Sequence, residues 1–177
     1  MIVQVTKLEA AIRQLNTAIT LVFDDGDSVV IHTLATAAAN IFSDVIESID
    51  ASKSWRGMVK SDHGLSNAQY RDVMHEAWNF FKHADRNPES VLKFDDRWSE
   101  YLIFFAILEC SEVHRLTIQM QTFQLWFLAG DAFTLDESDE IQTLARLAFP
   151  SMSSCSREKR LHLGKQMLLE QMQEPRD

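Results

Sequence analysis

Residues 5–49 read VTKLEAAIRQLNTAITLVFDDGDSVVIHTLATAAANIFSDVIESI. The first half repeats its apolar side chains at alternating steps of three and four residues: Val5, Leu8, Ile12, Leu15, Ile19, Val22 and Phe23. This spacing aligns them along one side of a helix. Asp24-Asp25-Gly26-Asp27 interrupts the repeat; Gly26 suits the left-handed conformation that ends a helix, and Asp27 suits the cap of the next. So short a turn predicts an antiparallel helical hairpin at the N-terminus.

The second half predicts a helix over residues 27–49 with two distinct sides. One side is apolar and holds Ile31, Leu34, Ala38, Ile41, Phe42, Val45 and Ile49. The neighbouring strip is made of small side chains with one imidazole: His32, Ala35, Thr36, Ala39 and Ser43. Small side chains let another backbone approach closely. We expect the end of the helix over residues 66–84 to pack along this strip, with His32 at its edge.

The middle of the chain predicts a loop followed by two helices. Residues 50–65 keep no sustained period and predict the longest loop, with one helical turn around Trp55. Ser66 and Gln69 have the spacing of a capping box, which opens a helix to about Ala84. Pro88 stops that helix. Asp95 or Asp96 then caps a helix to about Arg115, whose stretch YLIFFAIL is apolar all round and predicts the most buried helix.

The last third predicts three shorter helices. Residues 119–129 are apolar enough for a short helix or a buried strand, and the lack of a pairing partner favours the helix. One residue of Asp136 to Ser138 is expected to cap a helix that runs to Phe149. Residues 157–173 are expected to form the last helix. The sequence therefore predicts a single-domain all-α bundle of six or seven helices in total. Residues 1–150 form the bundle domain, and the C-terminal helix in 151–177 packs on it or extends from it.

Composition and charge exclude several classes of protein. The chain has 177 residues with only five Gly and three Pro, too few for the turns of a β-sandwich. Its formal charge of −9 repels phosphate backbones, which makes nucleic acid an unfavourable partner. The N-terminus has no signal-peptide pattern, and the apolar run of residues 101–108 is too short to cross a membrane. We expect a cytoplasmic protein with reduced thiols and no membrane contact.

The string HEAWNFFKHADR, residues 75–86, holds the first candidate site. Asn79 stands where the metalloprotease pattern H-E-x-x-H needs its second histidine, so no metal site is expected there. Two interpretations of the end of the string stay open. In one, Lys82 and His83 complement the helix dipole while Asp85 and Arg86 bond within the turn. In the other, Asp85 orients the His83 ring for general-base chemistry.

Glu109 is the second candidate because it follows the all-apolar run. If it is buried, it needs a cation, hydrogen-bond donors or a proton, and His32, Lys82 and His83 are the expected partners. These four residues form the predicted polar cluster. The alternative is that Glu109 lies where the helix emerges into solvent. Cys110 beside it is expected to be a small core residue.

The stretches AIRQLNTAI, VVIHTLATAAANI and WNFFKHADRNPES resemble an uncharacterised bacterial family of cytoplasmic all-α proteins with the pattern IHTLA … FFKHADR-x-P. The resemblance covers about residues 8–110, marks His32, Lys82, His83, Asp85 and Arg86 as positions to test, and implies no activity. A looser resemblance is to HEPN domains, helical bundles that include dimeric RNA-cleaving toxins with an Arg and a His near the start of the last long helix. Neither of the two pairs available here, Arg71 with His75 and Arg56 with His63, matches that pattern in both spacing and context.

These observations favour a non-enzymatic interaction or regulatory module that forms a homodimer. Another protein is the further partner left open, and no cofactor is expected. The alternative is a HEPN-like ribonuclease or toxin-type hydrolase that uses His83 with Asp85 or Arg86. A second alternative is a metal-binding bundle in which His32, His83, Asp85 and Glu109 converge. Each alternative depends on where the fold places these side chains.

Overall fold

The computed structural model describes residues 2–85, 87–130 and 139–173, with the side chains of 71–73 left out. Within these ranges the chain is helical and holds no strand, which confirms the all-α prediction. The helices are α1 (Lys7–Phe23), α2 (Ser28–Glu47), η1 (Ala51–Lys53), α3 (Trp55–His63), α4 (Asn67–Met74), α5 (Glu76–Lys82), α6 (Arg97–Val113), α7 (Ile118–Ala129), α8 (Glu140–Ala148), η2 (Met152–Ser154) and α9 (Arg157–Gln173).

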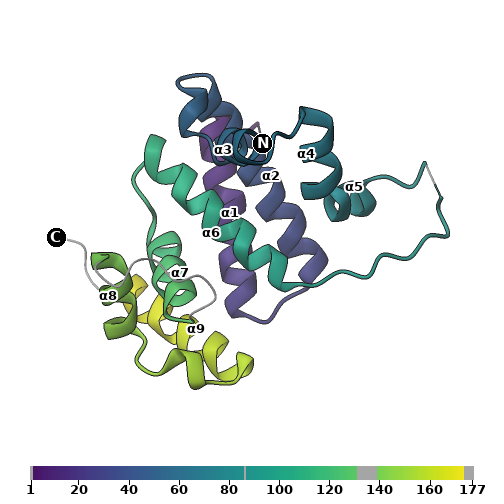
Figure 1. The fold of residues 1–177 in the computed structure, drawn as a ribbon. Coiled ribbons are helices and arrows are strands. Elements are labelled where there is room, and N and C mark those ends of the chain that lie inside the picture. Colours follow the sequence, from purple (N-terminus) through teal and green to yellow (C-terminus); the bar gives the residue numbers. More distant parts are fainter. Residues whose placement is uncertain (1, 86, 131–138, 174–177) are drawn as a thin grey trace.

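The N-terminal hairpin of α1 and α2 is confirmed (Figure 1). A side chain caps the start of each of the two helices. Thr6 and Glu9 form a capping box at the start of α1. Asp27 caps α2, because its Oδ1 accepts hydrogen bonds from the backbone N–H of Val29 and Val30. The left-handed residue of the turn is Asp25, with φ 52°, and not Gly26 as predicted. A short polar side chain tolerates this conformation.

Helix α6 packs along the small-residue strip of α2, where the end of the 66–84 helix was expected (Figure 1). His32 contacts Ser99, and Ser43 contacts Glu109. Because both residue numbers rise together, α2 and α6 run in the same direction. A parallel pair needs a long connection, which α3, α4 and α5 provide. The expectation is therefore confirmed in part: α6 is the main element along this strip, and α5, the end of the predicted 66–84 helix, also contacts α2, with Phe81 against His32.

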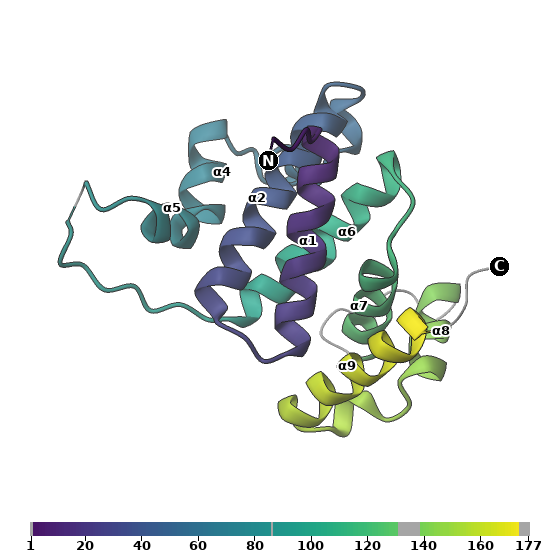
Figure 2. The ribbon, with the colours of Figure 1, turned by 180° about the vertical axis from the view of Figure 1, so that it is seen from behind.

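Helices α7, α8 and α9 cover one end of the hairpin (Figure 2). The core there is aromatic: the Phe104 and Phe127 rings stack at 4.6 Å, and Trp126 donates a hydrogen bond from Nε1 to the carbonyl of Arg160 at 2.7 Å. At Gly164 the backbone of α9 comes so close to α1 that an added Cβ would lie 2.3 Å from the Phe23 ring. The helix over residues 119–129 is confirmed as α7, and the C-terminal helix packs on α1 and α7.

The segment between α2 and α6 differs from the prediction in two ways. Residues 50–65 are mostly helical, because Ser54 caps α3 and Gly64, in the left-handed conformation, ends it. The predicted helix over 66–84 starts at the expected capping box of Ser66 and Gln69 but is broken at His75 into α4 and α5. The cap predicted at 136–138 lies outside the described residues, and Asp139 caps the described part of α8.

Among the described helices, α2 alone is long and apolar enough, by length and composition, to cross a membrane. Of its most apolar stretch, 44% is buried inside the protein. Core helices of soluble proteins pass the same test, so this property assigns α2 to neither environment.

Candidate functional site

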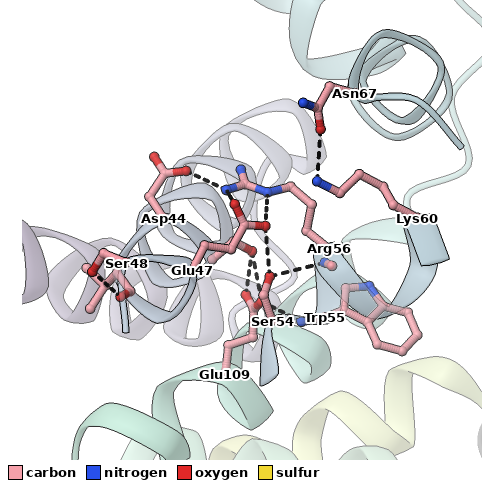
Figure 3. A network of polar contacts seen from close by, with 12 residues as sticks. Asp44, Glu47, Ser48, Ser54, Trp55, Arg56, Lys60, Asn67 and Glu109 are labelled. Carbon is pink, nitrogen blue, oxygen red and sulfur yellow. Dashed lines mark hydrogen bonds and ion pairs between the residues drawn. The ribbon is translucent and has the colours of Figure 1, made fainter. Parts of the chain in front are cut away.

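Glu109 is buried, with 4% of its surface exposed, and its partners are donors from α2 and from the start of α3 (Figure 3). The Ser43 hydroxyl lies 2.8 and 2.9 Å from the two carboxylate oxygens. The backbone N–H of Trp55 donates to Oε1 at 2.9 Å, and the Ser54 hydroxyl at 3.3 Å. Burial raises the pKa of Glu109, and these hydrogen bonds oppose the rise. The buried alternative is therefore correct, with hydrogen-bond donors as partners.

Arg56 ties α3 to the end of α2 next to this carboxylate (Figure 3). Its Nε donates to Glu47 Oε1 at 2.9 Å and its Nη2 to Glu47 Oε2 at 2.7 Å. The same Nη2 lies 2.6 Å from Asp44. These contacts raise the pKa of Arg56 and lower that of Glu47. Paired, fork-like geometry of this kind positions a helix, so we assign this network a structural role.

A small polar cavity lies beside Glu109. It has a volume of about 20 Å³, room for one water-sized molecule, and its polar lining includes Thr36, Asn40, Tyr70 and His75. The Thr36 hydroxyl is buried without a hydrogen-bond partner among the described residues. Burial is the main cause that raises the pKa of Tyr70 to about 12, with the nearby Glu109 charge adding to it. The Tyr70 hydroxyl is therefore a neutral donor at physiological pH, and the cavity is too small for a substrate.

A larger cavity of about 280 Å³ lies between α2, α3, α5, α6 and the segment before α6. Its wall is aromatic: Trp55, Phe94, Trp98, Tyr101 and Phe105 line it together with His32. Trp55 stacks on Phe105, with ring centroids 3.8 Å apart and an interplanar angle of 9°. The Trp98 side chain is 61% exposed, so this wall reaches the surface. The charged lining residues are Glu76, Lys93 and Asp95.

His32 is 5% exposed and forms part of the floor of this aromatic cavity. Its Nδ1 lies 3.2 Å from the Ser99 hydroxyl, and its ring makes edge contacts with Phe81 and Phe94. Its Nε2 is buried, and no described residue forms a hydrogen bond with it. Burial, together with the nearby His75, lowers the pKa of His32 to about 4, so the ring is neutral at physiological pH.

The structure does not bring the predicted polar cluster together. Lys82 is exposed and lies over the Trp78 ring at 3.4 Å, and His83 is exposed at the end of α5. His32 and Ser43, the partner of Glu109, are eleven residues apart on α2, or about 16 Å along the helix. The expectation that His32, Lys82 and His83 pair with Glu109 is wrong, because serines and a backbone N–H fill that place.

Two of the candidate catalytic residues, His83 and Asp85, line neither cavity. The side chains of His83 and Asp85 are exposed and make no hydrogen bond or ion pair with the described residues, and Arg86 lies outside these residues. Of the HEPN-type pairs, Arg56 and His63 lie on α3, where a loop was predicted, and Arg56 is held by carboxylates. The side chain of Arg71 is not described. His75 lies between the rings of Tyr70 and Trp78.

No group of three or more His, Cys, Asp or Glu side chains that could hold a metal ion occurs in the described part of the chain. The convergence of His32, His83, Asp85 and Glu109 required by the metal-binding alternative is not formed. Comparison with protein-family models, curated proteins and solved structures finds no match for this chain.

The aromatic cavity itself was not foreseen from the sequence. Its signal was present on α6, where Trp98, Tyr101 and Phe105 follow at steps of three and four and so share one side of the helix. Because that helix was interpreted as apolar on all sides, its aromatic stripe was not recognised as the wall of a cavity. Ser99 gave no signal, because a serine near a helix start is common for capping reasons.

Proposed function

We propose that the protein is a non-enzymatic helical binding module whose binding site is the aromatic cavity. The cavity of about 280 Å³ is the observation that carries this proposal. Concave sites with mostly apolar walls and a few polar groups are the usual binding sites for small molecules. The ring of Trp98 at the surface offers a route by which a flat molecule can enter between aromatic faces.

The volume sets the size of the group that fits. A cavity of about 150 Å³ holds one benzene. The cavity of about 280 Å³ therefore has room for two fused rings. The parallel rings of Trp55 and Phe105 favour a planar group over a branched aliphatic one, because stacked faces present a flat wall.

The non-enzymatic part of the proposal is supported by the state of the nucleophile and base candidates. Cys110 is buried, and burial raises the pKa of its thiol to about 11, which disfavours the reactive thiolate. His83 and Asp85 lie on the surface, outside the linings of the aromatic and polar cavities.

The binding test uses indole, a bicyclic probe, followed by amide chemical shifts of the labelled protein. We expect shifts that saturate and cluster on α5, α6 and residues 92–95. Ala77 lines the cavity, and Ala77→Phe fills part of it, so indole should bind at least about tenfold more weakly. Ala68→Phe makes the same change at an exposed site on α4 and should leave binding unchanged. Absence of saturable binding, or equal binding by both variants, would refute the proposal.

Self-association is a second part of the proposed function. Leu144 and Leu147, 56% and 73% exposed, are three residues apart on α8 and share one side of that helix. We expect sedimentation velocity at micromolar concentration to show a dimer, and Leu147→Glu to dissociate it. Val91→Glu, a change at another exposed apolar residue, is the control. A wild-type protein that sediments only as a monomer would remove this part.

A further inference from the structure

The lining of the aromatic cavity includes a residue with a buried polar atom that no described residue satisfies. His32 Nε2 has no hydrogen-bond partner in the described part of the chain, while the other ring nitrogen is held by Ser99. Buried polar groups in folded proteins are almost always paired, and an unpaired one calls for an explanation. The position of His32 in the lining of the cavity makes a ligand atom the natural partner.

The Ser99 hydroxyl decides which ring nitrogen carries the hydrogen. Ser99 is 2% exposed, and the only hydrogen bond of its hydroxyl to a described residue is the one to His32 Nδ1. If Nδ1 carried the hydrogen, both the serine O–H and Nε2 would be left unpaired. If the serine donates to Nδ1, only Nε2–H is unpaired, and this arrangement has the lower cost. His32 therefore presents an N–H donor, and its ligand must supply an acceptor.

Phe94 packs against the ring that carries that donor. Its ring centroid lies 4.8 Å from that of His32 in an edge-on contact, and it also lines the cavity. Phe94 belongs to the stretch 91–95, which has no helix to hold it in place. A ligand acceptor reaches Nε2 when this ring moves aside, and the ligand ring then takes over the aromatic contact that Phe94 gives up.

We propose that the cavity binds a neutral bicyclic heteroaromatic molecule whose ring nitrogen or carbonyl accepts a hydrogen bond from His32 Nε2–H. This inference rests on the proposed function and adds the chemistry of the ligand. The accepting group of the ligand is uncharged, because a protonated ring nitrogen would have no lone pair to offer. The second ring lies against the stacked Trp55 and Phe105.

The test compares naphthalene with isoquinoline, which has the same shape but carries a ring nitrogen, at a slightly alkaline pH where isoquinoline is neutral. Dissociation constants are measured by amide shift titration for the wild type and His32→Phe. We expect the preference for isoquinoline over naphthalene to fall about three- to tenfold in the variant, the effect of one hydrogen bond. Thr36→Val removes another buried, unpaired polar group from α2, outside this cavity, and should keep the wild-type preference.

A second measurement does not depend on the variant being folded. In the wild type, a long-range proton–nitrogen spectrum of the imidazole should show hydrogen on Nε2, and isoquinoline but not naphthalene should shift that nitrogen. Suppose that both probes bind, that His32→Phe keeps the wild-type preference for isoquinoline, and that isoquinoline does not shift the Nε2 signal. The inference about the ligand is then wrong, while the proposed binding function is retained. If neither probe binds, the proposed function itself fails.

Discussion

The Ser43 hydroxyl on α2 lies between the two carboxylate oxygens of Glu109 on α6, at 2.8 and 2.9 Å. Ten residues earlier on α6, Ser99 meets His32 in the same way. Two polar contacts thus help to fix the register of two parallel helices. Because the same Glu109 also accepts the first backbone N–H of α3, one carboxylate positions three helices. The aromatic cavity, which lies between these helices, depends on that arrangement.

Replacement of Glu109 by leucine should destabilise the protein strongly. The variant leaves the Ser43 hydroxyl and the Trp55 N–H buried without an acceptor, which costs about 3 kcal/mol in the free energy of unfolding. Glu109→Gln keeps one acceptor oxygen and should lose about 1 kcal/mol. Chemical denaturation measures both. A leucine variant as stable as the wild type would show that these hydrogen bonds contribute nothing.

The pH dependence of the glutamine variant has a definite sign. Burial raises the pKa of Glu109 in the folded protein above its unfolded value, so its contribution to stability is complete below the unfolded pKa and is lost as pH rises through the folded pKa. Glu109→Gln carries no such dependence. Its stability relative to the wild type should therefore improve as pH rises from acid to neutral, and a relative loss over that range would contradict the assigned direction.

Arg56 is expected to tolerate lysine poorly. Its guanidinium donates from Nε and Nη2 to the two oxygens of Glu47, and a single ammonium cannot reproduce that fork. We expect a loss of about 1 kcal/mol for Arg56→Lys and about 2 kcal/mol for Arg56→Ala, with faster amide hydrogen exchange in α3. Lys53→Ala breaks the exposed pair with Glu112 and should cost less than about 0.5 kcal/mol. Equal effects of the lysine variant and this control would exclude a special role for the fork.

The sequence allowed prediction of the elements that local interactions decide. The hairpin follows from a repeat of apolar residues and the cap at Asp27, and the helix at Asn67 follows from the capping box of Ser66 and Gln69. Each of these signals joins residues within one or two turns. Within the hairpin, the identity of the left-handed residue, Asp25 in place of Gly26, differed, because a short polar side chain can also adopt that conformation.

The site could not be predicted because it depends on contacts between distant parts of the chain. Glu109 is satisfied by Ser54 and Trp55, from a segment without any periodic pattern, and His32 by a serine sixty-seven positions away. Spacing along one helix cannot show which helix lies across from it. The cluster at the end of α5 attracted attention because its residues are chemically dense, yet a helix end favours such residues for electrostatic reasons alone.

Acid should destabilise the wild type through His32. The pKa of His32 falls from 6.5 to about 4 on folding, so the unfolded chain takes up the proton first. The contribution to stability is complete above 6.5 and is lost as pH falls toward about 4, with an upper limit of about 3 kcal/mol. In denaturation experiments over this pH range, the free energy of unfolding of His32→Phe should fall less than that of the wild type, by up to about 3 kcal/mol. Thr36→Val, a buried change on the same helix, should follow the wild type; an identical acid response of the His32 variant would refute the prediction.

Gly164 offers a case in which two effects of one methyl group have opposite signs. Alanine in a helix is favoured over glycine by about 1 kcal/mol. At this position, however, the new Cβ would lie 2.3 Å from the ring of Phe23, which is itself packed edge-on against Trp126. Overpacking of this kind costs about 1 to 3 kcal/mol, so we expect Gly164→Ala to destabilise the protein in chemical denaturation.

A double-mutant cycle identifies the cause of that loss. Phe23→Leu removes the ring atoms that the new methyl group would meet, so Gly164→Ala should be neutral or stabilising in that background. The same loss in both backgrounds would mean that Phe23 is not the obstacle and that α9 does not approach α1 as closely as the structure has it. If Gly164→Ala stabilises the otherwise wild-type protein, helix propensity outweighs the close contact. The packing between α1 and α9 then rearranges to accommodate the methyl group.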